Sequence, residues 1–313
     1  MKSKALVFVG LTLILYNLIE GIYMDDTTSI QQTLRQDPLL GTILDGRYKI
    51  ISLIGHGGMG KIFLGEQLST GRKVAVKIMQ AFDLEEDNQA VRFFKQEIRA
   101  LAKLNHHNIA QIYDASTSGD IFYIAIEHIK GETLRDRLNL HRRLTVEEAL
   151  HILRETCSGL DAAHHMDIIH RDIKPENIML TSDIDGSIHT KILDFGIAIL
   201  ERSSALSNPT GAGEFAGTPA YMSPEQVMSE KLTPLTDIYS LGVVGYELLT
   251  GVNPFAASRS PYQIAMNHVT LIPPTMRDFL PEIPIHIEEV IMRAIEKNPH
   301  NRFSTAKEFA NAL

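Results

Sequence analysis

From residue 47 onward, apolar residues gather into short runs that are separated by glycine, serine and threonine. The runs RYKIISLI, KIFLGEQL and VAVKIM are divided by the glycine-rich stretch GHGGMG and by the stretch STGRK. Short runs of β-branched and aromatic residues bounded by such turns are typical of strands. The pattern predicts a meander in which a strand, a glycine turn, a strand, a second turn and a third strand follow one another.

Further along the chain the apolar spacing becomes helical. Residues 89–104, QAVRFFKQEIRALAKL, and residues 145–167, TVEEALHILRETCSGLDAAHHMD, carry apolar residues every three or four positions. This spacing predicts amphipathic helices. Thr145 is the expected N-cap of the second helix, because its hydroxyl can accept a hydrogen bond from the first turn. Strands are predicted at residues 122–126 and on both sides of a turn at residues 182–186.

Composition and charge narrow the class of protein. The chain has 313 residues, of which 44% are hydrophobic and 22% charged, as in ordinary globular domains. A net charge of -8 and a pI near 5.9 argue against a nucleic-acid partner, which would require a basic face. The single cysteine, Cys157, excludes an intrachain disulfide and a cysteine-based zinc site.

The N-terminal residues form a separate hydrophobic segment, residues 1–24. Ala5 to Ile19 carries no charge and follows Lys2 and Lys4, but it is shorter than the roughly 20 residues that cross a bilayer as a helix. Three interpretations stay open: a membrane anchor with contact through residues 5–23, an export signal without an A-x-A-like cleavage site, or an extension upstream of a start at Met24. Residues 25–46 are expected to be a linker.

The glycine-rich stretch matches two phosphate-binding patterns. As G-x-x-x-x-G-K-[ST] it would be a Walker A loop, and as G-x-G-x-x-G it would be the glycine-rich flap over ATP in protein kinases. A Walker A loop needs a hydroxyl where Ile62 stands, and it leads from a strand into a helix. The strand pattern on both sides favours the flap.

Two further segments concentrate ionisable residues between apolar runs. The stretch HRDIKPEN spans residues 170–177, and KILDFGIAI places Asp194 between two apolar runs. Charged groups in such a loop are usually directed at a ligand or a reaction. Lys77 within VAVKIM is either an edge residue or a buried lysine that needs a partner, and Glu97 beside the apolar stripe of residues 89–104 is the candidate partner.

Seven motifs in order, GHGGMGKI, VAVK, Glu97, HRDIKPEN, DFG, GTPAYMSPE and DIYSLG, resemble the eukaryotic-like Ser/Thr protein kinases, and most closely the bacterial branch with the PASTA-type kinases. The resemblance covers about residues 48–313. It implies an α+β, bilobal fold with a five-stranded antiparallel sheet and one helix in the N-lobe and a larger, mainly helical C-lobe. The domain is expected at residues 47–313, with the N-lobe at 47–128 and the C-lobe at 129–313.

The resemblance also implies the parts of a phosphoryl-transfer site for ATP and Mg²⁺. Asp172 would orient the substrate hydroxyl and accept its proton, Lys174 would neutralise the transferred phosphoryl group, and Lys77, held by Glu97, would contact the α/β-phosphates. Asn177 and Asp194 would bind the metal ions. Ile126 takes the gatekeeper position. The remaining nucleotide-binding positions are the flap and the residues around adenine and the hinge: Ile54, Gly55, His56, Gly57, Gly58, Met59, Gly60, Ile62, Ala75, Glu127, Ile129 and Met179.

Substrate class and regulation are implied by the same resemblance. Lys174 and Thr218 follow the Ser/Thr pattern, so protein serine or threonine is the expected acceptor. Arg171 beside Asp172 is suited to pair with a phosphorylated loop, and Thr210 aligns best with an activating phosphosite. Autophosphorylation between two copies would require a homodimer. Glu225 and Arg302 are expected to form a buried ion pair, and Asp237 to have a structural role.

Three functions remain from the sequence: an active Ser/Thr protein kinase, a pseudokinase scaffold, and a small-molecule phosphotransferase of related fold. Every catalytic position is filled, which favours the first, and the GTPAYMSPE segment argues against the third. A kinase needs cytosolic ATP, so the kinase domain is expected in the cytoplasm, with export as the alternative.

Overall fold

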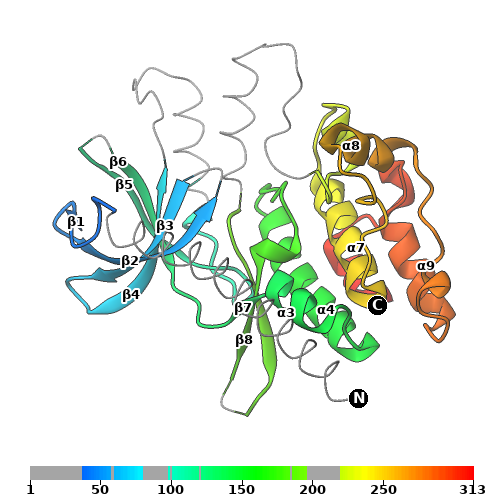
Figure 1. Ribbon diagram of the computed structural model, residues 1–313, viewed down its shortest axis with the longest axis horizontal. Coiled ribbons are helices and arrows are strands. Elements are labelled where there is room, and N and C mark those ends of the chain that lie inside the picture. The colour runs from blue at the N-terminus through cyan, green and yellow to red at the C-terminus, as the bar shows by residue number, and fades with distance from the viewer. Residues whose placement is uncertain are drawn as a thin grey trace, which may run out of the picture. The chain divides into compact units, whose positions relative to one another are not determined.

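The computed structural model describes residues 37–57, 60–79, 98, 101–119, 121–183, 185–195 and 219–313 (Figure 1). The chain divides into two compact units between Ile78 and Met79. The lobe boundary expected after residue 128 stays a prediction. Within the second unit, Ala110 N–H donates to Ile192 O over 2.9 Å, and Glu127 pairs with Lys191.

The first unit is an antiparallel sheet, as expected for the N-lobe. Its strands are β1 (Ile43–Leu44), β2 (Tyr48–Gly57), β3 (Gly60–Gln67) and β4 (Arg72–Met79), hydrogen-bonded in the order β1-β2-β3-β4. β2 to β4 are the three strands of the predicted meander. Alternate side chains of this sheet form its buried face, which contains Tyr48, Ile50, Phe63, Val74 and Val76.

Part of the expected linker, residues 37–46, belongs to this sheet. Gly41 N–H donates to Ile50 O over 3.0 Å, and Ile50 N–H donates to Thr42 O over 2.9 Å. β1 continues this pairing, with Leu44 opposite Tyr48 and buried. The short β1 strand therefore precedes the strands that the sequence predicted.

The second unit contains a strand pair and a three-stranded sheet. β5 (Ile112–Ser118) and β6 (Ile121–Glu127) form an antiparallel hairpin, and β7 (Glu132–Thr133), β8 (Ile178–Ser182) and β9 (Ile188–Ile192) form a small sheet in that order. β6 is the strand predicted at residues 122–126, and β8 and β9 flank the predicted turn. Most of the helix predicted at residues 89–104 lies outside the described residues.

Helices make up most of the rest of this unit. They are α3 (Leu134–His141), α4 (Val146–His164), α6 (Pro224–Val227), α7 (Pro234–Thr250), α8 (Pro261–Thr270), α9 (Ile285–Ala294) and α10 (Ala306–Ala312). The predicted N-cap of α4 is present, since Thr145 accepts a hydrogen bond from Glu148 N–H. Short 3₁₀ turns span Pro175–Asn177, Met276–Asp278 and Pro299–Asn301.

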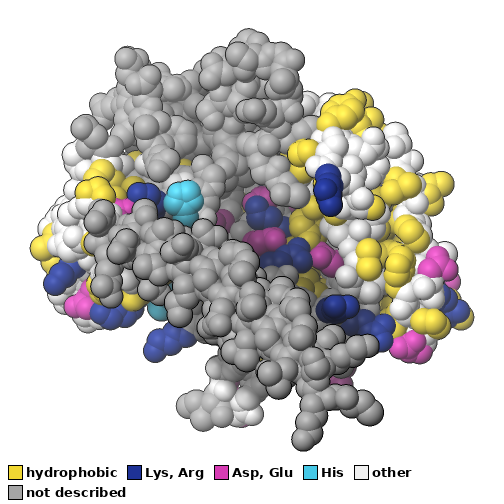
Figure 2. All heavy atoms as spheres, viewed as in Figure 1, with side chains coloured by type: hydrophobic (Ala, Val, Ile, Leu, Met, Phe, Trp, Pro, Cys, Tyr) yellow, Lys and Arg dark blue, Asp and Glu magenta, His cyan; other side chains and the backbone are white. Residues whose placement is uncertain are grey.

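The core of the second unit is built around α7, which packs against α4 and α9 (Figure 1). Nearly every residue of α7 is buried. Gly242 allows the close approach to α9, because a Cβ atom there would lie 2.8 Å from Ala294 Cβ. Some apolar side chains also reach the surface of this unit (Figure 2), among them Tyr262 and Ile272, which are 64% and 83% exposed.

Among the described residues, no helix combines the length and the apolar character that a membrane span requires. The hydrophobic segment at residues 5–23 lies outside the described residues, so the three interpretations of it stay open.

Candidate active site

The glycine stretch forms the turn of the β2–β3 hairpin. Gly57 pairs with Gly60, His56 with Lys61, and Gly55 with Ile62. Gly60 has a φ of 138°, a conformation that favours glycine. The chain continues into strand β3 and not into a helix, which excludes the Walker A interpretation. Gly58 and Met59 lie outside the described residues.

β4 carries the predicted lysine of the first unit. Val74 and Val76 lie in the sheet core, so strand alternation places Ala75 and Lys77 on the opposite face. Lys77 is only 4% exposed, which favours the buried-lysine interpretation over the edge interpretation. Its expected partner, Glu97, lies outside the described residues, so that ion pair stays a prediction.

In the second unit, one loop brings three of the predicted residues together. Lys174 Nζ lies 2.7 Å from Asp172 Oδ2, and Asn177 Nδ2 donates to Asp172 O at 2.7 Å and to Oδ2 at 2.9 Å. The 3₁₀ turn Pro175–Asn177 supplies the reversal that returns Asn177 to Asp172. Asp172 and Lys174 are half-buried, so a ligand can reach both side chains.

A buried carboxylate at the start of α7 fixes this loop. Asp237 accepts hydrogen bonds from His170 N–H and Arg171 N–H, each over 2.8 Å, and its Oδ2 atom lies 2.8 Å from His164 Nε2. Burial alone would raise the pKa of Asp237, but the hydrogen bond and charge of His164 lower that pKa below its ordinary value. Arg171 holds a left-handed φ of 70°, which these bonds stabilise.

His170 connects the loop to the segment that contains Asp194. Its Nδ1 atom accepts from Asp172 N–H over 3.2 Å, so Nε2 carries the proton and donates to Leu193 O over 2.7 Å. Its ring also packs edge-on against Phe195, with the centroids 4.6 Å apart. Asp194 has a left-handed φ of 57°. The position of Asp194 is thus tied to that of Asp172.

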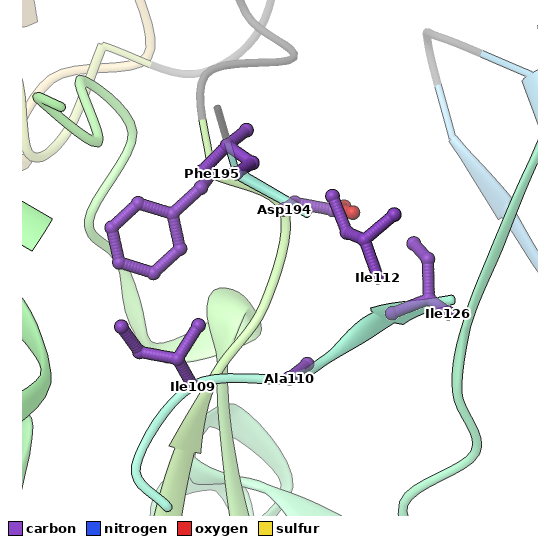
Figure 3. A pocket seen from close by; sticks show the side chains of 7 residues that line it. Ile109, Ala110, Ile112, Ile126, Asp194 and Phe195 are labelled. Atoms are coloured by element: carbon purple, nitrogen blue, oxygen red, sulfur yellow. The ribbon is translucent and has the colours of Figure 1, made fainter. Parts of the chain in front are cut away.

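Asp194 also lines a small apolar cavity of about 20 Å³ (Figure 3). The predicted gatekeeper Ile126 contributes to the same cavity, so the structure brings these two site residues together. In Figure 3 the Asp194 carboxylate points toward Ile112, whereas the Phe195 ring turns toward Ile109. The other residues of the lining are Leu101 and Ala110.

The predicted hinge begins at Glu127, the last residue of β6. Glu127 N–H donates to Gln111 O over 2.8 Å, and its carboxylate pairs with Lys191 at 2.9 Å. Ile129 and, on β8, Met179 are half-buried. A fixed hinge backbone with partly exposed apolar neighbours is suited to contact a flat ring.

Two predicted structural residues form the expected buried ion pair. Arg302 donates to both carboxylate oxygens of Glu225, over 2.8 Å and 2.9 Å. Burial would raise the pKa of Glu225, but the Arg302 guanidinium holds it below its ordinary range. The regulatory candidates Thr210 and Thr218 lie outside the described residues.

A second charged network, which the sequence did not indicate, includes Glu176 of the loop at residues 170–177. Arg135 of α3 donates to Glu176 over 2.8 Å and to Glu247 of α7 over 2.9 Å. The Tyr221 hydroxyl hydrogen-bonds both Arg135 and Glu247. Glu176 could have been recognised only by its position inside the HRDIKPEN motif, because its partner Arg135 lies 41 residues away in the sequence.

The donor atoms present fit a magnesium ion better than a transition metal. Among the residues that the structure describes, no group of three or more histidine, cysteine, aspartate or glutamate side chains could hold a metal ion. The NH₂ group of Asn177 donates to Asp172, so its Oδ1 atom can serve as a metal ligand. Asp194 adds carboxylate oxygens as further ligand atoms. Oxygen donors are those that Mg²⁺ prefers, with phosphate and water completing its shell.

Comparison with known proteins gives one consistent result. The family model for the protein kinase domain matches residues 48–312. The serine/threonine-protein kinase PrkC of Bacillus subtilis is 38% identical over 270 residues, which are 86% of this chain and 40% of PrkC. PknA of Mycobacterium tuberculosis is 36% identical over 281 residues, covering 88% of this chain and 62% of PknA. The chain therefore spans less than two thirds of these relatives.

Solved structures agree on the fold. The crystal structure of the M. tuberculosis PknI kinase domain aligns with a TM-score of 0.68 at 25% identity, covering 87% of this chain and 96% of that one. The fold class expected from the sequence is thereby confirmed.

Proposed function

Since this chain belongs to the protein kinase family, we propose that it is a serine/threonine protein kinase, which transfers the γ-phosphoryl group of ATP to serine or threonine hydroxyls of proteins. The observation that best supports this function is the loop in which Lys174 and Asn177 both contact Asp172 within 2.9 Å. Bacterial relatives named as serine/threonine-protein kinases, together with the filled catalytic positions, support this function over a pseudokinase.

In this proposal each residue of the loop has a distinct task. Asp172 orients the acceptor hydroxyl and accepts its proton, and the Asn177 hydrogen bond holds the carboxylate in place for that step. Lys174 neutralises negative charge that develops on the transferred group. Asp237 and His170 keep the loop backbone fixed, so the carboxylate needs little reorganisation when the acceptor arrives.

Each nucleotide-binding residue has its own task in this proposal. Backbone N–H groups of the glycine hairpin would contact the phosphates, and Lys77 would pair with their charge. Asn177 and Asp194 would hold Mg²⁺, which when bound neutralises phosphate charge. Ile62, Ala75 and the half-buried side chains after the gatekeeper would contact the adenine ring.

Regulation and location complete the proposal. Phosphorylation of a hydroxyl in residues 196–217, with Thr210 first, would give Arg171 an anionic partner, and two copies would phosphorylate one another. The catalytic domain would work in the cytoplasm, where ATP is present, with residues 5–23 as a membrane contact.

The test is phosphoryl transfer by the purified chain to a protein acceptor, comparing wild type with Asp172→Asn. Asn at this position retains an oxygen for the Asn177 hydrogen bond but cannot take the proton, so we expect a folded protein whose rate falls about 10²- to 10⁴-fold. Glu282→Gln, which removes an exposed carboxylate, should leave the rate unchanged. Full activity of Asp172→Asn would refute the assignment.

A further inference from the structure

An ion pair ties the residues that precede the sheet to the glycine hairpin. Lys61 Nζ lies 2.6 Å from Asp37 Oδ2, although the two residues are 24 positions apart. The Asp37 side chain is 5% exposed and the Lys61 side chain 31% exposed. Because the Asp37 side chain is covered, the pair is screened less than a pair of two exposed side chains.

Backbone hydrogen bonds hold Asp37 in place. Its Oδ1 atom accepts from Leu39 N–H over 3.0 Å, and its carbonyl oxygen accepts from Leu40 N–H over 3.0 Å. The chain then bonds to the middle of β2 through Gly41 and Thr42, which both pair with Ile50. These bonds fix the position of the Asp37 carboxylate relative to β2.

Lys61 lies beside the turn of the glycine hairpin. It pairs with His56, one step from the Gly57–Gly60 pair that closes the turn. Because side chains alternate along a strand, Lys61 points to the face opposite its neighbour Ile62. Lys61 therefore does not line the adenine side that is proposed for Ile62, and its contact restrains the hairpin from the opposite face.

The charge state of the pair suits this role near neutral pH. Burial would raise the pKa of Asp37, but the hydrogen bond from Lys61 lowers that pKa below its ordinary value. Asp37 therefore stays ionised at physiological pH, and the attraction to the lysine ammonium is retained.

We propose that Asp37 is a positioning residue for nucleotide binding, which holds the glycine hairpin through Lys61 in the conformation that accepts the ATP phosphates. The inference rests on the proposed kinase function. A hairpin that is already positioned loses less conformational freedom when it binds, which increases affinity without changing the chemical step. In this proposal, part of the segment that was expected to be only a linker increases the affinity for ATP.

The test compares the full chain with the variants Asp37→Asn, Lys61→Met and the double variant. Asn keeps the acceptor for Leu39 N–H and removes only the charge. We expect the KM for ATP to rise about three- to tenfold in each variant, with kcat at saturating ATP unchanged. Both single changes remove the same contact, so the double variant should match the single ones.

A matched control lies in the same sheet. Glu66, at the end of β3 remote from the glycine turn, forms an ion pair at 2.5 Å with Lys73 of β4. Glu66→Gln and Lys73→Met remove a charge of the same kind and should leave the KM for ATP unchanged. An unchanged KM in Asp37→Asn, or an equal rise in these controls, would overturn the proposal.

Hydrogen exchange separates this inference from the kinase function itself. In the nucleotide-free chain, amides of residues 55–62 should exchange several times faster in Asp37→Asn than in wild type, while those of residues 66–73 should not change. If wild type transfers no phosphate but this difference is seen, the kinase function fails and the restraint of the hairpin stands. Equal exchange at residues 55–62 would overturn the restraint.

Discussion

At the scale of single residues, Lys297 has an environment that does not suit its charge. Its Nζ atom is buried, 4.1 Å from the centroid of the Phe255 ring, with no hydrogen-bond partner among the described parts of the chain. Burial and the nearby Arg302 guanidinium lower the pKa of Lys297 to about 8. The contact with the ring offsets only part of the lost hydration.

This environment predicts that Lys297→Met stabilises the fold. The lysine pKa is lower in the folded than in the unfolded chain, so protonation favours unfolding. The destabilisation is complete below pH 8 and disappears as the pH rises toward 10.5. Because the side chain is half-buried, we expect a gain of about 1 kcal/mol in the free energy of unfolding at pH 7.

Urea unfolding at pH 7 and at pH 10 measures this effect. The difference between Lys297→Met and wild type should be largest at pH 7 and should shrink at pH 10. Lys307→Met, at an exposed position of α10, should match wild type at both values. A Lys297→Met variant that is no more stable than wild type at pH 7 would contradict the explanation.

At the scale of elements, the first turn of α7 and the loop at residues 170–177 are directly connected. Asp237 at this turn binds the backbone of His170 and Arg171 and also contacts His164 at the end of α4. Helix α7 is itself fixed by its nearly complete burial. The loop that carries Asp172 is thus bonded directly to the helical core, which restrains its backbone.

Asp237→Asn is expected to disturb both stability and catalysis. An amide presents one oxygen where the carboxylate presents two, so one buried N–H group of the loop would face another donor. We expect a loss of about 3 kcal/mol in the free energy of unfolding and a tenfold or greater fall in kcat. Thermal unfolding and steady-state rates measure the two effects, with Glu289→Gln on the exposed side of α9 as the control. Unchanged kcat would show that the loop does not depend on α7.

At the scale of the whole molecule, local patterns predicted more than distant contacts. The meander of β2 to β4, helix α4 with its Thr145 cap, and the proximity of Asp172, Lys174 and Asn177 each follow from a few neighbouring positions. The Glu225–Arg302 pair was expected only because a family resemblance supplied it. Spacing alone cannot connect residues 77 positions apart.

The contacts that the sequence did not indicate have no local signature. Asp37 lies in a segment that reads as a polar linker, and nothing near it points to Lys61. Arg135 is one of several charged residues on a polar helix, and its partners come from three other parts of the chain. Such pairs are set by the packing of elements, which determines which charges meet and which remain in water.

The most direct test of the account is phosphoryl transfer from ATP to a protein acceptor by Lys77→Met, compared with Lys73→Met on the same strand β4. Lys77 is buried in the first unit, whereas Lys73 is an exposed partner of Glu66. Lys77→Met removes the charge that is proposed to pair with the phosphates, so it should lower the rate about 10²-fold or more, whereas Lys73→Met should keep it. A wild-type rate in a folded Lys77→Met variant would contradict the proposed kinase.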